Sequence, residues 1–232
     1  MKNRIINTVI FVVALLSTIV ALQFLPDVVP THFDIGGVAD DWGSKYTLLM
    51  TPVIILAMQL VGEGLVLMFR RQAESAADDK TRAEAEANLK LVPIVFLVVS
   101  VMFAILNFVF LYMTFTQLDA TPTAQIDVMK IVVALLGLSF IAIGNYMPKA
   151  RKNSTFGLRC KWSMYNDRTW ARSNKFGGIA FMMLGAALIL FSLITEGMMT
   201  IIYMMVALIW VILLSLVYAY VVYRQEKGKE QK

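Results

Sequence analysis

The chain has 232 residues, of which 59% are hydrophobic and only 16% are charged, and its mean hydropathy is +0.70. A soluble domain of this size needs more polar surface than this composition supplies, so we expect a membrane protein. The single cysteine, Cys160, excludes an intramolecular disulfide and a metal site built from several cysteines.

Six apolar runs are each long enough to form a membrane-spanning helix, which needs about 20 apolar residues. They lie at 5–26, 46–69, 91–118, 131–147, 176–195 and 198–223. The first run is longer than the apolar part of a typical signal peptide and no small-residue cleavage site follows it, so we read it as a retained anchor. The sequence predicts an all-α membrane protein, a single domain over 1–232 with six transmembrane helices.

The Lys and Arg residues predict the orientation of these spans. Nineteen of the 21 fall near the N-terminus, in the connections 70–90 and 148–176, or in the C-terminal tail. Because cytoplasmic connections are enriched in positive residues, we expect both termini and these two loops in the cytoplasm. The connection 26–46 is then an ordered extracytoplasmic loop. Topology accounts for the positive charge, so no direct contact with nucleic acid is expected.

The connection 26–46 contains several signals for a compact, ordered loop. Pro26 ends the first span, and Gly36-Gly37 favours a tight turn with positive φ. Trp42 suits the membrane interface, and Ser44 is placed to cap the next helix.

The same loop contains the only histidine, His32, close in sequence to Asp34, Asp40 and Asp41. These side chains could bind a ligand or a metal ion, or His32 could hydrogen-bond a carboxylate and hold the loop together. One histidine among carboxylates is a weak zinc signal, because zinc sites usually contain more nitrogen or sulfur ligands. His32, Asp34 and Asp40 are therefore only weak metal candidates, and we expect no cofactor.

The second span contains two polar residues, Gln59 and Glu63, one helical turn apart. Carboxylates inside membranes are costly and often functional, which favours a site within the membrane. Alternatively, Glu63 lies near enough to the cytosol to pair with Arg70 or Arg71. The segment 70–90 that follows is rich in Ala, Glu, Lys and Arg, which favours helical extensions of the flanking spans.

The connection 148–176 alternates basic residues with aromatic ones, among them Trp162, Tyr165 and Trp170. This pattern is typical of an interfacial helix that meets anionic lipid, and a docking surface for a soluble partner is the alternative. Asn166 is the expected N-cap of a short helix leading toward Gly177-Gly178.

At these two connections the chain resembles the SdpI family of bacterial membrane immunity proteins. The first motif comprises Leu25, Pro26, Pro30, His32, Gly37, Asp40, Trp42, Gly43 and Lys45. The second comprises Gly144, Asn145, Pro148, Lys149, Asn153, Gly157, Arg159, Trp162, Ser163, Trp170, Gly177 and Gly178. The chain departs from the family pattern at Asp41, at Cys160-Lys161 and at Asn174-Lys175.

The resemblance implies a non-enzymatic immunity protein of the bacterial cell membrane that protects against a secreted peptide toxin or bacteriocin. It also implies signal transduction by recruitment of a cytoplasmic transcriptional repressor to the membrane. The expected ligand-binding residues are His32, Asp34, Asp40, Trp42 and Lys45. The expected partner-binding residues are Asn145, Pro148, Lys149, Asn153, Arg159, Trp162, Trp170 and Arg172. The alternatives are a metal-dependent membrane hydrolase and a small-molecule or ion transporter that uses Gln59 and Glu63.

Overall fold

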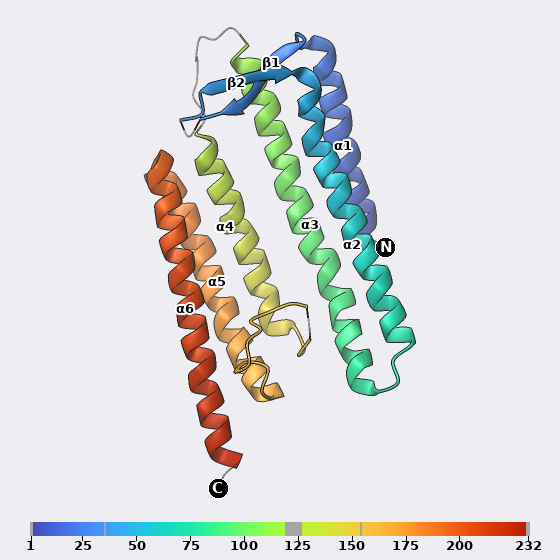
Figure 1. Cartoon of the computed structure of the whole chain (residues 1–232), viewed down its shortest axis with the longest axis vertical. Helices are drawn as coiled ribbons and strands as arrows, with labels where there is room; N and C mark the ends of the chain where they lie inside the picture. Colours follow the sequence, from blue (N-terminus) through green and yellow to red (C-terminus); the bar gives the residue numbers. More distant parts are fainter. Residues whose placement is uncertain (1, 35, 119–126, 154, 231–232) are drawn as a thin grey trace.

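The computed structural model describes residues 2–34, 36–118, 127–153 and 155–230. Within them, six long helices lie alongside one another (Figure 1) and each is long and apolar enough to cross a membrane. This confirms the predicted class of membrane protein with six transmembrane helices. The helices are α1 (Lys2–Phe24), α2 (Met50–Glu74), α3 (Asp79–Thr116), α4 (Val128–Tyr146), α5 (Asp167–Ile194) and α6 (Gly197–Glu230).

Two short strands, β1 (Val28–Phe33) and β2 (Ala39–Ser44), form a hairpin between α1 and α2. Figure 1 shows the hairpin at one end of the helices, with the α2–α3 turn and the C-terminus toward the opposite end. The segment between α4 and α5 also lies toward that opposite end. The two motif-bearing connections therefore lie at opposite ends of the molecule, as the sequence predicts.

Helices α2 and α3 are joined by a tight connection, Ser75 to Asp78. Asp78 caps α3, because its Oδ1 accepts a hydrogen bond from the Thr81 backbone N–H at 2.8 Å and its Oδ2 accepts one from the Thr81 hydroxyl at 2.7 Å. These bonds hold the pKa of Asp78 below its usual value. The predicted helical extension of both spans through 70–90 is confirmed.

Helices α4 and α5 cross at pairs of glycines that face each other across the interface. A methyl group added at Gly178 would lie 2.5 Å from the carbonyl oxygen of Gly144, and one added at Gly185 would lie 2.3 Å from that of Gly137. Only glycine permits such an approach of two backbones, as is common between membrane helices. Leu184 and other buried residues fill the neighbouring core. This crossing fixes the position of α5 relative to the end of α4.

Helices α1 and α3 share a buried polar contact. The Thr18 hydroxyl lies 3.3 Å from Asn107 Oδ1, and Asn107 Nδ2 lies 3.5 Å from the Ser17 hydroxyl. Asn107 is 2% exposed and Thr18 is fully buried. Such contacts join membrane helices, because an unpaired polar group in hydrocarbon is costly.

Candidate functional site

The hairpin is antiparallel, with Val28 opposite Ser44 and Pro30 opposite Trp42. Its turn is closed by Asp34, whose Oδ1 accepts hydrogen bonds from the backbone N–H groups of Gly36 at 2.9 Å and Val38 at 2.8 Å. Gly37 has φ of 79°, the positive value expected for this turn. The all-α prediction omitted these strands, because the prolines, glycines and acidic residues of 26–46 are poor strand formers individually.

Both apolar and polar contacts attach the hairpin to the helices. Val29 is fully buried and packs with Ala21, Leu25 and Leu111. On the polar side, Gln117 Oε1 accepts from the Ala39 backbone N–H at 2.8 Å and its Nε2 donates to the Gly37 carbonyl at 2.7 Å. Sequence reasoning missed Gln117, and the available signal was a lone amide at the end of an apolar run.

His32 and Asp40 form an exposed pair on the hairpin, with Nδ1 and Oδ1 2.5 Å apart. The Asp40 hydrogen bond, and then its charge, raise the pKa of His32 from its ordinary value of 6.5. The interpretation of His32 as bonded to a loop carboxylate therefore agrees with the geometry. Asp34 instead uses its oxygen to close the turn. Among the residues described, no three His, Cys, Asp or Glu side chains gather as metal ligands.

The other two hairpin candidates differ in their accessibility. Lys45 is largely enclosed: its ammonium group donates to the Leu25 carbonyl and pairs with Asp27 Oδ1, both at 3.2 Å. It therefore holds the end of α1 to the hairpin. Trp42 is 39% exposed and lies in the same strand as Asp40 and Asp41. An exposed aromatic ring beside carboxylates can contact a ligand that has both apolar and cationic groups.

At the other end of the molecule, residues 150–153 and 155–166 are irregular, and the predicted short helix after Asn166 is present as the start of the long helix α5. Asn153 is fully buried; its Nδ2 donates to the carbonyls of Arg151 and Phe156, and its Oδ1 accepts from the backbone N–H groups of Thr155 and Phe156. Ser163 donates to the Leu158 carbonyl at 2.6 Å. Side chains that pair with nearby backbone compete with helix formation, which explains why this segment is not helical.

Two further buried side chains fasten this segment to α5. Trp170 is 3% exposed and its Nε1 donates to the Ala150 carbonyl at 2.8 Å. Asn174 Oδ1 accepts from the Leu158 backbone N–H at 2.7 Å. At the neighbouring Gly157, φ is 112° and an added methyl would lie 2.3 Å from Asn174 Oδ1. Asn153 and Trp170 therefore hold the segment together and present little surface to a partner.

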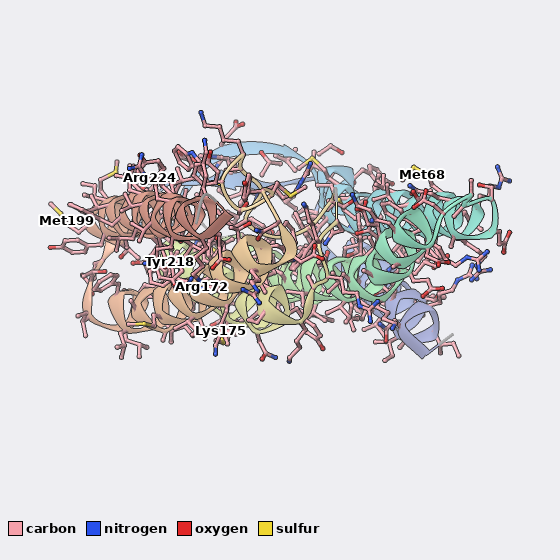
Figure 2. The ribbon with its side chains drawn as sticks, turned by 90° about the horizontal axis from the view of Figure 1, so that it is seen from below. Met68, Arg172, Lys175, Met199, Tyr218 and Arg224 are labelled. Atoms are coloured by element: carbon pink, nitrogen blue, oxygen red, sulfur yellow. The ribbon has the colours of Figure 1, made fainter. Side chains whose placement is uncertain are left out.

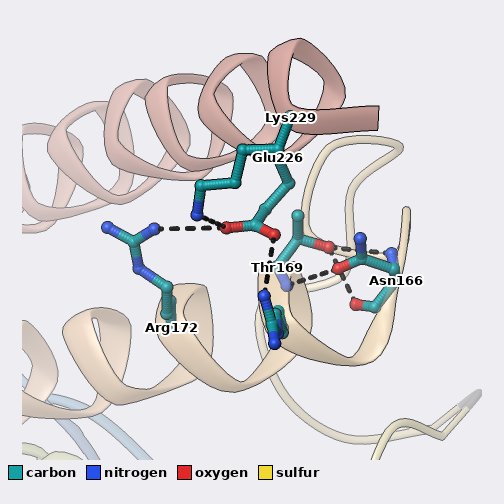
Figure 3. A network of polar contacts seen from close by, with 6 residues as sticks. Asn166, Thr169, Arg172, Glu226 and Lys229 are labelled. Carbon is teal, nitrogen blue, oxygen red and sulfur yellow. Dashed lines mark hydrogen bonds and ion pairs between the residues drawn. The ribbon is translucent and has the colours of Figure 1, made fainter. Parts of the chain in front are cut away.

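The N-terminus of α5 is held against α6 by the network in Figure 3. Asn166 and Thr169 form a capping box, which confirms the predicted N-cap, although α5 continues as the fifth span. Glu226, on α6, has a side chain only 7% exposed, 2.9 Å from Lys229 and 3.8 Å from both Arg168 and Arg172. Arg172 is thus engaged by Glu226.

The remaining candidates at this end fall into two groups. Asn145, Pro148, Lys149 and Arg159 are exposed, with Lys149 Nζ 3.2 Å from Asn145 Oδ1. Trp162 is half-buried, and its ring lies 5.1 Å from that of Tyr220 on α6. The exposed group is the part of the predicted set that a partner can reach.

Gln59 and Glu63 line a cavity of about 600 Å³ between α1, α2 and α3. Glu63 Oε1 lies 2.8 Å from Arg4 Nε, and Gln59 Nε2 donates to the Asn7 carbonyl at 2.5 Å. The alternative in which Glu63 pairs with Arg70 or Arg71 is wrong, because Arg4 in the first turn of α1 pairs with Glu63 instead. Sequence spacing cannot show which neighbouring helix supplies the cation.

Comparison with known proteins gives one family match toward each end of the chain. Residues 149–220 match the SdpI/YfhL protein family, and residues 9–56 match a domain of unknown function, DUF1648. The chain is 22% identical to Immunity protein SdpI of Bacillus subtilis (strain 168) over 228 residues, or 98% of this chain and 99% of that protein. The resemblance to the SdpI family is confirmed. The SdpI/YfhL match contains the segment before α5, the whole of α5, and α6 as far as residue 220. The DUF1648 match contains the hairpin. No solved structure matches the chain significantly.

Proposed function

We propose that the chain is a membrane immunity protein that protects its cell against a secreted peptide toxin. The observation that supports this most strongly is the similarity to Immunity protein SdpI, which extends over nearly the whole of both chains. Protection of this kind needs a binding surface and no catalysis, so we propose that the protein is not an enzyme. Its working surface then lies where a peptide arriving from outside meets the molecule.

We propose that the hairpin is that surface and faces away from the cytoplasm. Positive residues gather at the opposite end, which favours this orientation. The hairpin and its flanks carry Asp27, Asp34, Asp40 and Asp41 against Lys45 and His32, so they are acidic when His32 is neutral. Exposed apolar side chains accompany this charge, with Trp42 39%, Val28 58% and Tyr46 63% exposed. A cationic, amphipathic peptide complements such a surface in charge and polarity.

We further propose that the opposite end passes a signal to a cytoplasmic transcriptional repressor. Asn145 and Lys149 are exposed there at the end of α4 and in the turn after it, and Arg159 is exposed on the segment that buried hydrogen bonds keep in place. Such coupling requires that the peptide bind two conformations of the protein with different affinity. Arg159→Gln should abolish a transcriptional response to the peptide while leaving survival unchanged. Equal loss of both would contradict a separate signalling surface.

Survival of a sensitive strain tests the immunity proposal. Cells expressing the chain and cells carrying an empty vector are exposed to a panel of secreted cationic peptides. We expect the inhibitory concentration of at least one peptide to rise several-fold on expression, with that of membrane-inactive antibiotics unchanged. Equal inhibitory concentrations for every peptide, with the protein shown to be present in the membrane, would refute the proposal.

A further inference from the structure

A groove runs along α3 from the middle of the helices to their basic end. Four adjoining cavities form it, of about 310, 10, 310 and 510 Å³ in that order. Neighbouring cavities share lining residues: Val98 and Ala142 join the first two, Leu91 and Tyr146 the next two, and Lys149 the last two. The groove therefore faces α4 in its middle part, and residues 148–152 and the start of α5 at its basic end; Figure 1 shows α3 and α4 diverging toward that end.

The lining changes character along the groove. The middle part is formed by aliphatic residues with Met102 and Ser139, and Ser139 uses its hydroxyl to bond the Leu135 carbonyl. From Leu91 to Ile105 on α3 the lining spans about 21 Å at 1.5 Å per residue. One leaflet of a bilayer has a hydrocarbon thickness of about 15 Å, half of the core. The apolar part is thus long enough for an acyl chain that begins at one membrane surface.

The basic end of the groove is lined by five cations and three carboxylates. The cations are Lys80, Lys90, Lys149, Arg151 and Lys152, and the carboxylates are Glu84, Glu86 and Asp167. Within the described part of the chain, none of these five cations has a carboxylate within ion-pair distance. By contrast, nearby Arg168 and Arg172 share the buried Glu226. The groove cations are therefore available to an anion from outside the chain.

We propose that this groove binds one anionic phospholipid, with its phosphate beside Lys149 and Arg151 and an acyl chain against the apolar lining. Lys149 and Arg151 line both cavities of the basic end, so they lie nearest to its centre. The ammonium group of Lys149 contacts two neutral groups: it donates a hydrogen bond to Asn145 Oδ1 at 3.2 Å and lies 5.0 Å from the centre of the Tyr146 ring. The bound lipid would connect α3 to the end of α4 and to residues 150–152, which follow α4 in the chain. This inference does not depend on the proposed immunity function.

Native mass spectrometry of the detergent-purified protein tests this with phosphatidylglycerol, phosphatidylcholine and inorganic phosphate as probes. The test variant is Lys149→Gln/Arg151→Gln. The matched control, Lys175→Gln/Arg224→Gln, removes two cations from the same end that do not line the groove; Figure 2 shows Lys175 on α5 and Arg224 on α6. Thermal unfolding in neutral detergent verifies that both variants remain folded.

We expect wild type and control to retain phosphatidylglycerol in preference to phosphatidylcholine. The test variant should bind phosphatidylglycerol about thirty-fold more weakly, since each cation near an anionic lipid contributes about a five-fold gain. Millimolar inorganic phosphate should not displace the lipid, because it cannot occupy the apolar part. The proposal would be overturned if the protein retained the two lipids equally, if the two variants bound phosphatidylglycerol equally, or if phosphate displaced the lipid. A dimer that retains no lipid would also overturn it, because a second copy of the chain would then occupy the groove.

Discussion

The crossing of α4 and α5 at Gly144 and Gly178 offers a sharp test of how the helices are held together. In Gly178→Ala the new methyl group would lie 2.5 Å from the Gly144 carbonyl oxygen and 2.8 Å from Pro148 Cδ. Ordinary contact begins at 3.4 Å, so the two backbones must separate by about 0.9 Å. Overpacking of this kind costs about 1–3 kcal/mol.

The matched control is Gly64→Ala on α2, where an added methyl group meets nothing within 4 Å. Both substitutions lie inside helices, so the gain in helix propensity of about 1 kcal/mol is common to them and cancels in the comparison. We expect the free energy of unfolding, measured by denaturant titration in mixed micelles with circular dichroism, to be about 1–3 kcal/mol lower for Gly178→Ala. Values within about 0.5 kcal/mol of each other would refute the close-crossing argument.

Three further predictions follow from contacts of the hairpin and from the proposed orientation. His32 is the only histidine, so its imidazole signals can be followed by NMR without ambiguity; its pKa should exceed 6.5 and return toward 6.5 in Asp40→Asn. Because the His32 pKa is raised in the folded protein, the stabilisation from the His32–Asp40 pair is present below the unfolded pKa and is lost as pH rises through the folded pKa. Equal His32 pKa values in the wild type and in Asp40→Asn would exclude the pairing. Gln117→Leu should accelerate hydrogen exchange at the Ala39 amide, whereas Gln59→Leu should not, and unchanged exchange in the first variant would exclude the attachment. A membrane-impermeant maleimide should label Trp42→Cys/Cys160→Ser in intact cells, but should label Cys160 of the parent chain only after permeabilisation; the reverse pattern would invert the proposed topology.

The six spans were predictable from sequence because they depend on local composition. Apolar runs of the required length have few alternatives, and lipid forces their backbones into helices. The caps at Ser44 and Asn166 and the positive φ of Gly37 were predictable for a similar reason, because each depends on a few adjacent residues. Caps and turns of this kind can be predicted from neighbouring residues without knowing the fold.

Several of the features that sequence reasoning missed depend on residues far apart in the chain. Gln117 reaches back to Gly37 and Ala39, and Glu63 pairs with Arg4. The irregular conformation of residues 150–153 and 155–166 was not predicted, because the basic and aromatic residues of 148–176 also fit an interfacial helix. Two buried amides set this conformation: Asn153 bonds to backbone groups two or three residues away, whereas Asn174 accepts from the Leu158 N–H, 16 residues away in the chain.

These differences also change which candidate residues can bind a ligand or partner. Trp170, Asn153 and Lys45 are enclosed by the fold, whereas Trp42, Lys149 and Arg159 are accessible. Substitutions at the enclosed positions would disturb binding through loss of structure. The accessible positions are therefore the informative ones for functional experiments.

The proposed role of the hairpin is tested most directly by survival of sensitive cells that express Trp42→Ala. The matched control is Trp210→Ala, because Trp210 is 60% exposed and lies on α6, apart from the hairpin. With equal amounts of each protein in the membrane, we expect Trp42→Ala to lose most of the protection against the cationic peptide and Trp210→Ala to retain it. Full protection by Trp42→Ala, or equal loss in both variants, would contradict the hairpin as the surface that meets the toxin.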